Sequence, residues 1–383
     1  MAEYKKTGSC KVLVVTGCMA QRYKNEIIEE VPEVDAVLGT TSYGDILKAI
    51  REAMEGKHFQ EFKDIDYLPE KLGKRVLTTG GHFGYLKIAE GCDKHCTYCI
   101  IPKLRGKFRS VPMERLVTQA KEMAEEGVKE LILVAQETTV YGTDIYGKKS
   151  LHILLKELCK IKGIRWIRVL YCYPEEIYDE LIQTMKEEKK ICHYLDLPIQ
   201  HASDRILKRM GRRTTQAELV EIVNKLRREI PDIVLRTTLI SGFPGETQED
   251  HEELMGFVDE MEFDRLGVFT YSPEEDTPAA TMPDQVAEEV KEARRDEIME
   301  LQQEISYDKG TDRIGQELLV MIEGKVADES AYIGRTYGDA PKVDGYIFVQ
   351  TGELLMTGDF AKVRVTGALE YDLIGELADE YTE

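Results

Sequence analysis

Short apolar runs alternate with helical patterns through the middle of the chain. In residues 113–126, apolar side chains recur on one helical face and the pattern stops before Gly127, and residues 219–230 repeat that spacing. The apolar runs predict six buried strands, at 85–89, 131–135, 167–171, 194–199, 234–240 and 266–271. Because βαβ crossovers share one hand, these units predict an α/β fold with a parallel sheet curled into a partial (β/α)6 barrel.

A smaller α/β pattern precedes this barrel. Residues 11–16 and 34–38 predict strands, and residues 46–54 predict a helix. The polar stretch 56–75 has no periodicity and predicts a linker. We therefore expect a partial N-terminal domain over residues 1–75.

The pattern changes again after the barrel. Residues 284–308 predict one long charged helix, which ends the expected core domain of residues 76–310. The last region, residues 311–383, predicts a small β-barrel. Its β-type runs are separated by turn residues and lie at 317–322, 346–349 and 361–365.

The composition narrows the classes of function. The chain is 42% hydrophobic, carries a formal net charge of −20 and has no run of 18 apolar residues that could span a membrane. Such acidity disfavours nucleic-acid phosphates and favours a basic protein partner. Eight cysteines without a secretory signal are typical of a reducing compartment, so we expect a cytoplasmic protein whose cysteines bind metal or remain free.

Three of those cysteines are spaced for an iron–sulfur cluster. Cys92, Cys96 and Cys99 form a C-x3-C-x2-C loop, and three thiolates can hold three irons of a 4Fe–4S cluster while the fourth stays open to a small molecule. A zinc site needs a fourth ligand, and His95 adjoins Cys96 too closely to share one tetrahedron easily. A disulfide is less favoured in a chain without an export signal. The loop resembles the signature of radical S-adenosylmethionine (SAM) enzymes.

Further motifs extend this resemblance over nearly the whole chain. Their order is similar to that in methylthiotransferases of the radical SAM class, and they lie at 17–23, 90–102, 105–110, 136–144, 242–246 and 271–275. Within that family, residues 197–203 and 334–341 look most like the subfamily that modifies an aspartate of ribosomal protein S12. Sister subfamilies modify adenosine in transfer RNA, which is the alternative substrate.

The resemblance implies a reaction and its cofactors. SAM would bind the open iron of a 4Fe–4S cluster on Cys92, Cys96 and Cys99, and its reductive cleavage would give a radical that takes a hydrogen from the aspartate β-carbon. Sulfur would come from a second 4Fe–4S cluster, for which only Cys18 matches one of the family's three ligands. We therefore expect a chain that lacks the start of its N-terminal domain and is impaired in full methylthiolation. Its expected partners are S12 or the small ribosomal subunit, an electron donor and a sulfur donor.

Other motif residues have two interpretations each. Tyr98 contacts the adenine of SAM or packs on the barrel rim. Gln136 and Glu137 contact the cofactor or form a polar barrel mouth, and Gly242 and Gly245 admit a ligand or make a turn. His201 contacts the substrate or serves only as a hydrogen-bonding residue. The sequence identifies no catalytic acid or base.

The charge of the last region bears on the substrate. That region resembles a TRAM domain, a barrel that binds RNA in the transfer-RNA enzymes. Residues 311–383 contain six Lys and Arg against fifteen Asp and Glu, a balance that disfavours phosphate binding. It favours a basic ribosomal protein, although an ordinary solvated acidic surface would have the same composition. A non-catalytic protein that docks on the ribosome and a zinc-binding scaffold remain alternatives.

Overall fold

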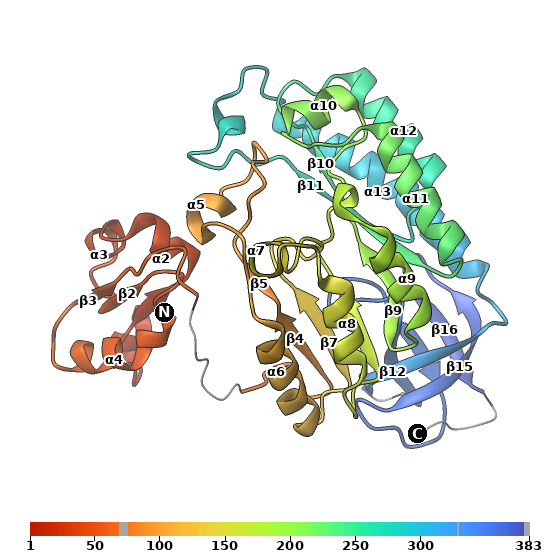
Figure 1. Cartoon of the computed structure of the whole chain (residues 1–383), viewed down its shortest axis with the longest axis horizontal. Helices are drawn as coiled ribbons and strands as arrows, with labels where there is room; N and C mark the ends of the chain where they lie inside the picture. The colour runs from red at the N-terminus through yellow and green to blue at the C-terminus, as the bar shows by residue number, and fades with distance from the viewer. Residues whose placement is uncertain (69–75, 328, 379–383) are drawn as a thin grey trace. The chain divides into compact units, whose positions relative to one another are not determined.

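The computed structural model describes residues 1–68, 76–327 and 329–378. These residues form two compact units, which we describe separately. The first unit comprises Met1–Val76, Ala89–His95 and Cys99–Arg109, and the second comprises Leu77–Ile88, Cys96–Tyr98 and Ser110–Glu383. Figure 1 labels many of their elements.

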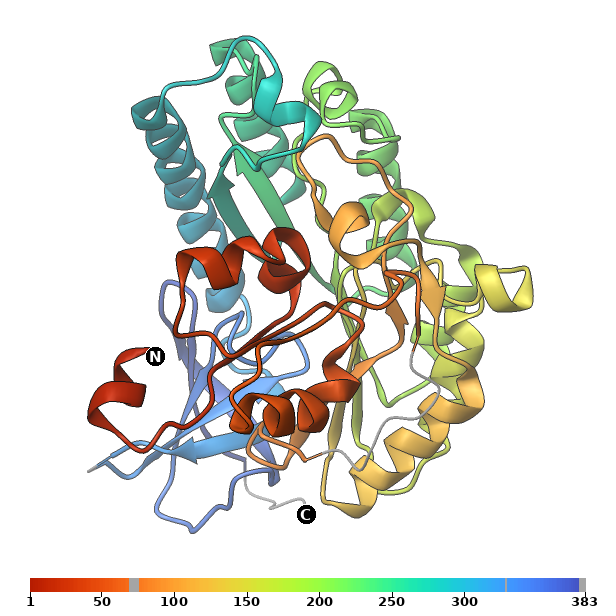
Figure 2. The same cartoon turned by 90° about the vertical axis from the view of Figure 1, so that its left-hand side faces the viewer.

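The first unit contains a three-stranded parallel sheet with helices on both faces (Figure 2). Apolar clusters fill the two faces, one around Val37 and one around Leu38. The strands are β1 (Val14–Thr16), β2 (Ala36–Leu38) and β3 (Phe59–Glu61), and the helices are α1 (Glu3–Thr7), α2 (Cys18–Tyr23), α3 (Glu26–Glu30), α4 (Ile46–Met54) and α5 (Ile101–Arg105). The interpretation of residues 56–75 as linker was wrong for β3, which pairs with β2 although it has only one apolar residue; residues 69–75 lie outside the described residues.

The second unit contains the predicted six-stranded parallel sheet, in which spatial order follows chain order. Its strands are β4 (Phe83–Lys87), β7 (Glu130–Val134), β8 (Trp166–Val169), β9 (Ile191–Asp196), β10 (Val234–Ser241) and β11 (Arg265–Thr270). The helices between and after them are α6 (Met113–Glu125), α7 (Thr143–Tyr146), α8 (Leu151–Cys159), α9 (Asp179–Glu187), α10 (Asp204–Arg209), α11 (Gln216–Glu229), α12 (Gln248–Met261) and α13 (Glu288–Thr311). A separate two-stranded sheet pairs β5 (Ala89–Glu90), which belongs to the first unit, with β6 (Arg109–Ser110), which begins in that unit.

The predicted small barrel is present and closed. Its strands are β12 (Glu317–Lys325), β13 (Ala331–Thr336), β14 (Ile347–Gln350), β15 (Phe360–Ala368) and β16 (Leu373–Leu377). The sequence pattern missed β13 and β16, each of which contains a glycine. A Cβ on Gly334 would lie 2.3 Å from Cγ1 of Val320, and one on Gly375 would lie 2.5 Å from Cγ1 of Val363. Close packing inside the barrel therefore requires glycine at these two positions, and these glycines interrupt the apolar pattern that would otherwise have predicted the strands.

The small barrel packs against the inner face of the large sheet. Phe83, Ile132 and Tyr194 from the sheet share one buried cluster with Phe360 of the small barrel. The ring of Trp166 meets that of Phe360 edge-on, with centroids 4.8 Å apart. None of the described helices is long and apolar enough to cross a membrane.

A buried ionic cluster lies beside this apolar contact. The Glu130 carboxylate accepts a hydrogen bond from Nε of Arg168 at 2.8 Å and one from Nη2 of Arg335 at 2.7 Å, and all three side chains are fully buried. Arg335 also donates to Glu323 at 2.6 Å. Burial alone would raise the pKa of Glu130, but Arg335 and Arg168 more than offset it and hold the pKa below its ordinary value.

We predict that Glu130→Gln strongly destabilises the second unit. The substitution leaves two buried guanidinium groups without their shared counter-charge, which costs about 3–5 kcal/mol of unfolding free energy. Trp166, the single tryptophan, lies in the adjacent cluster, so its fluorescence during urea unfolding reports the loss.

The matched control is Glu317→Gln, which removes an exposed partner of Arg364. It should cost less than about 1 kcal/mol. Because folding lowers the pKa of Glu130, this carboxylate contributes its full unfolding free energy above the pKa of an unfolded glutamate. The contribution is lost as the pH falls from that value through the lower pKa of the folded protein. Equal losses of unfolding free energy in Glu130→Gln and Glu317→Gln at neutral pH would contradict a stabilising role for the buried ionic cluster.

Candidate functional site

The loops after β7 and β8 are joined at the carboxyl end of the sheet. Thr138 donates its backbone N–H to the carbonyl of Tyr171 at 3.1 Å, and Tyr173 donates its N–H to the Thr139 hydroxyl at 3.3 Å. Glu137 is buried and accepts a hydrogen bond from that hydroxyl, while Gln136 is half-buried. Carboxyl ends of parallel strands carry the chemistry of barrel enzymes, so these loops form a candidate site.

The cysteine loop is divided between the two units. Cys96 belongs to the second, and Cys92 and Cys99 belong to the first. The Cys92 sulfur accepts the N–H of Lys94 at 3.4 Å, and the Cys96 sulfur lies 3.6 Å from the Tyr173 hydroxyl oxygen. All eight cysteines are free, and the described residues include no group of three or more His, Cys, Asp or Glu placed to hold a metal ion. Free thiols with hydrogen bonds to sulfur suit an iron–sulfur cluster, but the ligand set remains a prediction.

The segment around Cys96 is fixed by neighbouring backbone. Thr97 donates its N–H to Met210 at 2.9 Å and its hydroxyl to the Arg209 carbonyl at 2.8 Å. The ring of Tyr98 meets that of Phe243 edge-on, with centroids 6.4 Å apart. This contact agrees with the expectation that Tyr98 packs on the rim, and its contact with adenine stays a prediction.

Arg212 is a functional candidate that the sequence analysis missed. Its buried guanidinium lies over the ring of Tyr173 at 4.3 Å and donates to Glu175 at 3.3 Å. Nε and Nη1 are buried and have no hydrogen-bond partner among the described residues. Burial alone would lower the pKa of Arg212, but Glu175 and the nearby Tyr98 raise it, so the group stays charged. The adjacent Arg213 is exposed, and nothing in the sequence distinguishes the two.

The segment from Gly242 to Glu246 forms a tight turn after β10. Both glycines have positive φ, +70° at Gly242 and +83° at Gly245. The Glu246 carboxylate accepts the N–H groups of Gly242 at 2.8 Å and Phe243 at 3.1 Å. A Cβ on Gly242 would lie 2.2 Å from Cγ of Lys291. The turn and its packing therefore account for the glycines, which supports the alternative of a plain turn.

His201 is fully buried behind this turn. Its Nδ1 accepts the N–H of Ser203 at 3.0 Å, and its Nε2 lies 3.5 Å from the Glu246 carboxylate. Burial raises the pKa of Glu246, but His201 and Arg294 outweigh it and lower the pKa. The contacts agree with a hydrogen-bonding role for His201.

Cys18, the candidate ligand of a second cluster, has a specific neighbour in the first unit. Nε of Arg105 donates to its sulfur at 3.2 Å, and Nη1 of Arg105 lies 3.6 Å from Glu90. Burial raises the pKa of Cys159 and Cys192, which lie outside the motifs, to about 12, so these two thiols are less reactive than an ordinary cysteine.

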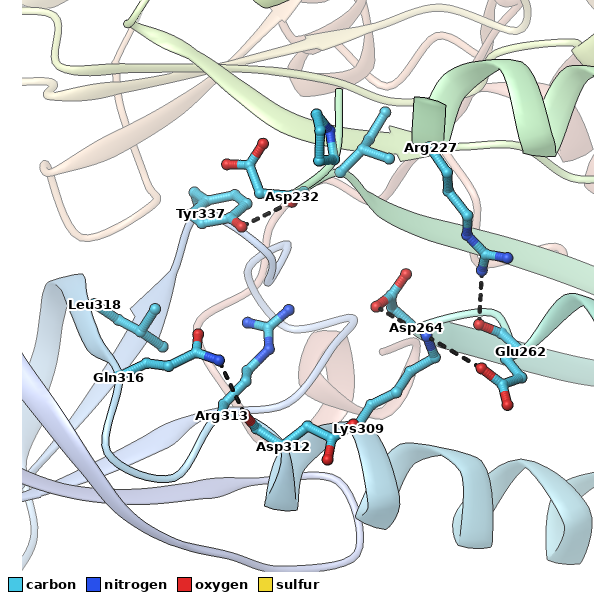
Figure 3. A pocket seen from close by; sticks show the side chains of 12 residues that line it. Arg227, Asp232, Glu262, Asp264, Lys309, Asp312, Arg313, Gln316, Leu318 and Tyr337 are labelled. Carbon is cyan, nitrogen blue, oxygen red and sulfur yellow. Dashed lines mark hydrogen bonds and ion pairs between the residues drawn. The ribbon is translucent and has the colours of Figure 1, made fainter. Parts of the chain in front are cut away.

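A charged pocket of about 530 Å³ lies elsewhere in the second unit (Figure 3). Asp232 precedes β10 and Asp264 precedes β11, so the pocket lies at the amino-terminal edge of the sheet. Arg227 donates to the Glu262 carbonyl at 2.8 Å, and Tyr337 donates to that of Asp232 at 2.8 Å. Acidic and basic side chains alternate around it, and it is separate from the candidate site.

Two family profiles match the chain. The Radical SAM superfamily matches residues 86–258, and the TRAM domain matches residues 314–378. The first profile runs from the end of β4 into α12 and includes the cysteine loop, and the second covers most of the small barrel.

Curated relatives extend the similarity beyond these domains. A "Ribosomal protein uS12 methylthiotransferase RimO" of Lachnoclostridium phytofermentans is 65% identical over 375 residues, which cover 98% of this chain and 85% of the relative. The proteins of the same name from Clostridium perfringens and Clostridioides difficile are 53% and 50% identical, and each match covers 99% of this chain and 85% of the relative. The chain therefore belongs to the RimO family of radical SAM methylthiotransferases.

Proposed function

We propose that this chain adds a methylthio group to the β-carbon of an aspartate in ribosomal protein uS12. The observation that carries the proposal is the 65% identity to a uS12 methylthiotransferase, which extends through both the core and the small barrel. A transfer-RNA adenosine substrate is the second candidate, because a TRAM-type barrel is present.

Membership of the radical SAM class implies a 4Fe–4S cluster and SAM. We propose that Cys92, Cys96 and Cys99 hold the cluster, and that Cys18 serves a second one with Arg105 fixing its sulfur. When bound, the first cluster and SAM supply a carbon radical able to remove hydrogen from a C–H bond.

Arg212 supplies charged hydrogen-bond donors suited to the carboxylate of SAM. Its Nε and Nη1, both buried and without a hydrogen-bond partner among the described residues, lie near Cys96 and Tyr98, and a carboxylate bound there accepts hydrogen bonds from both nitrogens. An unsatisfied buried donor is costly, and a bound carboxylate removes that cost. Gln136, Glu137, Gly242 and Gly245 remain proposed cofactor contacts at the same edge of the sheet.

The exposed charge of the small barrel supports a protein substrate. Phosphate binding displaces counterions and requires several available Lys and Arg side chains. The barrel region has fewer than half as many basic as acidic residues. A basic protein gains from such a surface, whereas RNA is repelled by it.

We predict that Cys92→Ala, Cys96→Ala or Cys99→Ala each removes the radical cluster. Anaerobic reconstitution of the unaltered chain should give about four irons for this cluster, and each variant should lose them. Iron and sulfide analysis measures the change, and Cys159→Ala, outside all motifs, is the matched control. Full retention of iron in the three variants would exclude them as ligands.

We predict that Arg212→Gln weakens SAM binding about ten-fold or more, because a charged hydrogen-bond pair is lost. Equilibrium binding of SAM to the reconstituted protein measures it. Arg213→Gln changes an exposed neighbour of the same type and should bind SAM as the unaltered chain does. Equal effects in the two variants would contradict a role for the buried donors.

We predict that deuterium from uS12 appears at the 5′-carbon of the 5′-deoxyadenosine released from SAM. The substrate carries deuterium at aspartate β-carbons, and mass spectrometry follows the label after addition of SAM and a strong reductant. The C–D bond breaks and a C–D bond forms at the 5′-carbon, so this readout does not depend on the second cluster. Transfer RNA deuterated in adenosine is the comparison; label from RNA and none from uS12 would overturn our choice of substrate.

A further inference from the structure

Tyr171 has an unusual backbone conformation beside the candidate site. It follows β8 at the carboxyl end of the sheet and has φ of +59°, a left-handed value that bulky residues rarely adopt. Its side chain is 47% exposed. Strained residues of this kind persist only where the surroundings hold them, and they concentrate at functional sites.

Hydrogen bonds on both sides hold this conformation. The Tyr171 N–H donates to the carboxylate of Asp196 at 3.0 Å. Its carbonyl accepts both the N–H and the hydroxyl of Thr138, each at 3.1 Å. The next N–H, that of Cys172, donates to the Asp196 carbonyl at 2.9 Å. Neither polar group of the strained residue is therefore left unsatisfied.

A chain of ionic contacts extends from Asp196 to the small barrel. Nη1 of Arg236 donates to Asp196 at 2.8 Å, and Nε of Arg236 lies 3.3 Å from Asp344. Asp344 also accepts the Tyr194 hydroxyl at 2.7 Å. The small barrel thus helps to orient the carboxylate that fixes the Tyr171 backbone.

The uncovered part of the inner face exposes aromatic surface. Phe269 on β11 is 63% exposed. It pairs with Ile240 of β10, which lies on the same face of the sheet as Arg236 of that strand. Exposed aromatic side chains beside a catalytic edge are typical anchors for a bound polypeptide.

We propose that Tyr171 packs against the segment of uS12 that carries the target aspartate, with Asp196 and Arg236 as positioning residues. The inference rests on the proposed function and names the residue that presents the substrate. The hydrogen bonds with Asp196 and Thr138 hold the backbone of Tyr171 in its left-handed conformation, and Arg236 orients Asp196.

The test measures the apparent KM for uS12 and the fraction of 5′-deoxyadenosine that carries deuterium from it. Tyr171→Ala should raise the KM about ten-fold and lower the labelled fraction by a similar factor, as expected for loss of an aromatic anchor. Tyr171→Phe keeps the ring and should stay within about three-fold. Asp196→Asn should raise the KM in the same direction, because the backbone loses a charged acceptor.

Tyr171→Gly separates function from folding. Glycine adopts positive φ without strain, so this variant should unfold at the same temperature or higher while it loses the labelled fraction as Tyr171→Ala does. Tyr307→Ala, at a 49% exposed tyrosine on α13, is the matched control and should behave as the unaltered chain.

The outcomes distinguish this inference from the proposed function. Unaltered KM and labelled fraction in Tyr171→Ala and Tyr171→Gly would overturn the role of Tyr171 while leaving the function intact. An equal loss in Tyr307→Ala would also overturn it. Absence of label with the unaltered chain would overturn the proposed function and the substrate contact together.

Discussion

The second unit depends on one buried carboxylate that is shared by two buried arginines. Glu130 begins β7, Arg168 lies on β8 and Arg335 lies on β13 of the small barrel. Moving three charges out of water is costly, and the cost is offset only when all three are in place with their hydrogen bonds. The ionic cluster therefore specifies one position for the small barrel on the sheet, which apolar packing alone would specify less strictly.

This position of the small barrel places the stabilising contacts at one end of the strands and leaves the candidate site at the other end. The small barrel covers the part of the inner face around Phe83 and Trp166, where strands begin. The loops at the other ends, around Glu137, Tyr171 and Arg212, are those that we propose to bind cofactor and substrate. Barrel enzymes generally divide their strands in this way. Through Arg236, Asp344 beside the small barrel helps to orient Asp196 at the carboxyl end of the strands.

The sequence predicted those elements whose pattern is set by burial. Parallel strands buried on both faces are nearly continuous apolar runs, so all six were found, and the helix at residues 46–54 was correct to the residue. The conformation of residues that depend on tertiary contacts could not be predicted from the sequence. Tyr171 was placed inside a strand, whereas β8 ends at Val169 and hydrogen bonds from distant loops set its conformation. The cysteine spacing predicted the cofactor class, but only burial distinguishes Arg212 from Arg213.

The structure also strengthens the argument from charge. Of the basic residues in the small barrel, Arg335 is fully buried and neutralised within the fold. Arg364 forms an exposed ion pair with Glu317 at 2.9 Å. The side chains available to phosphates are thus fewer than the sequence count. For a basic ribosomal protein the charge is favourable, because exposed carboxylates such as those of Glu353 and Glu370 attract its lysines and arginines during encounter.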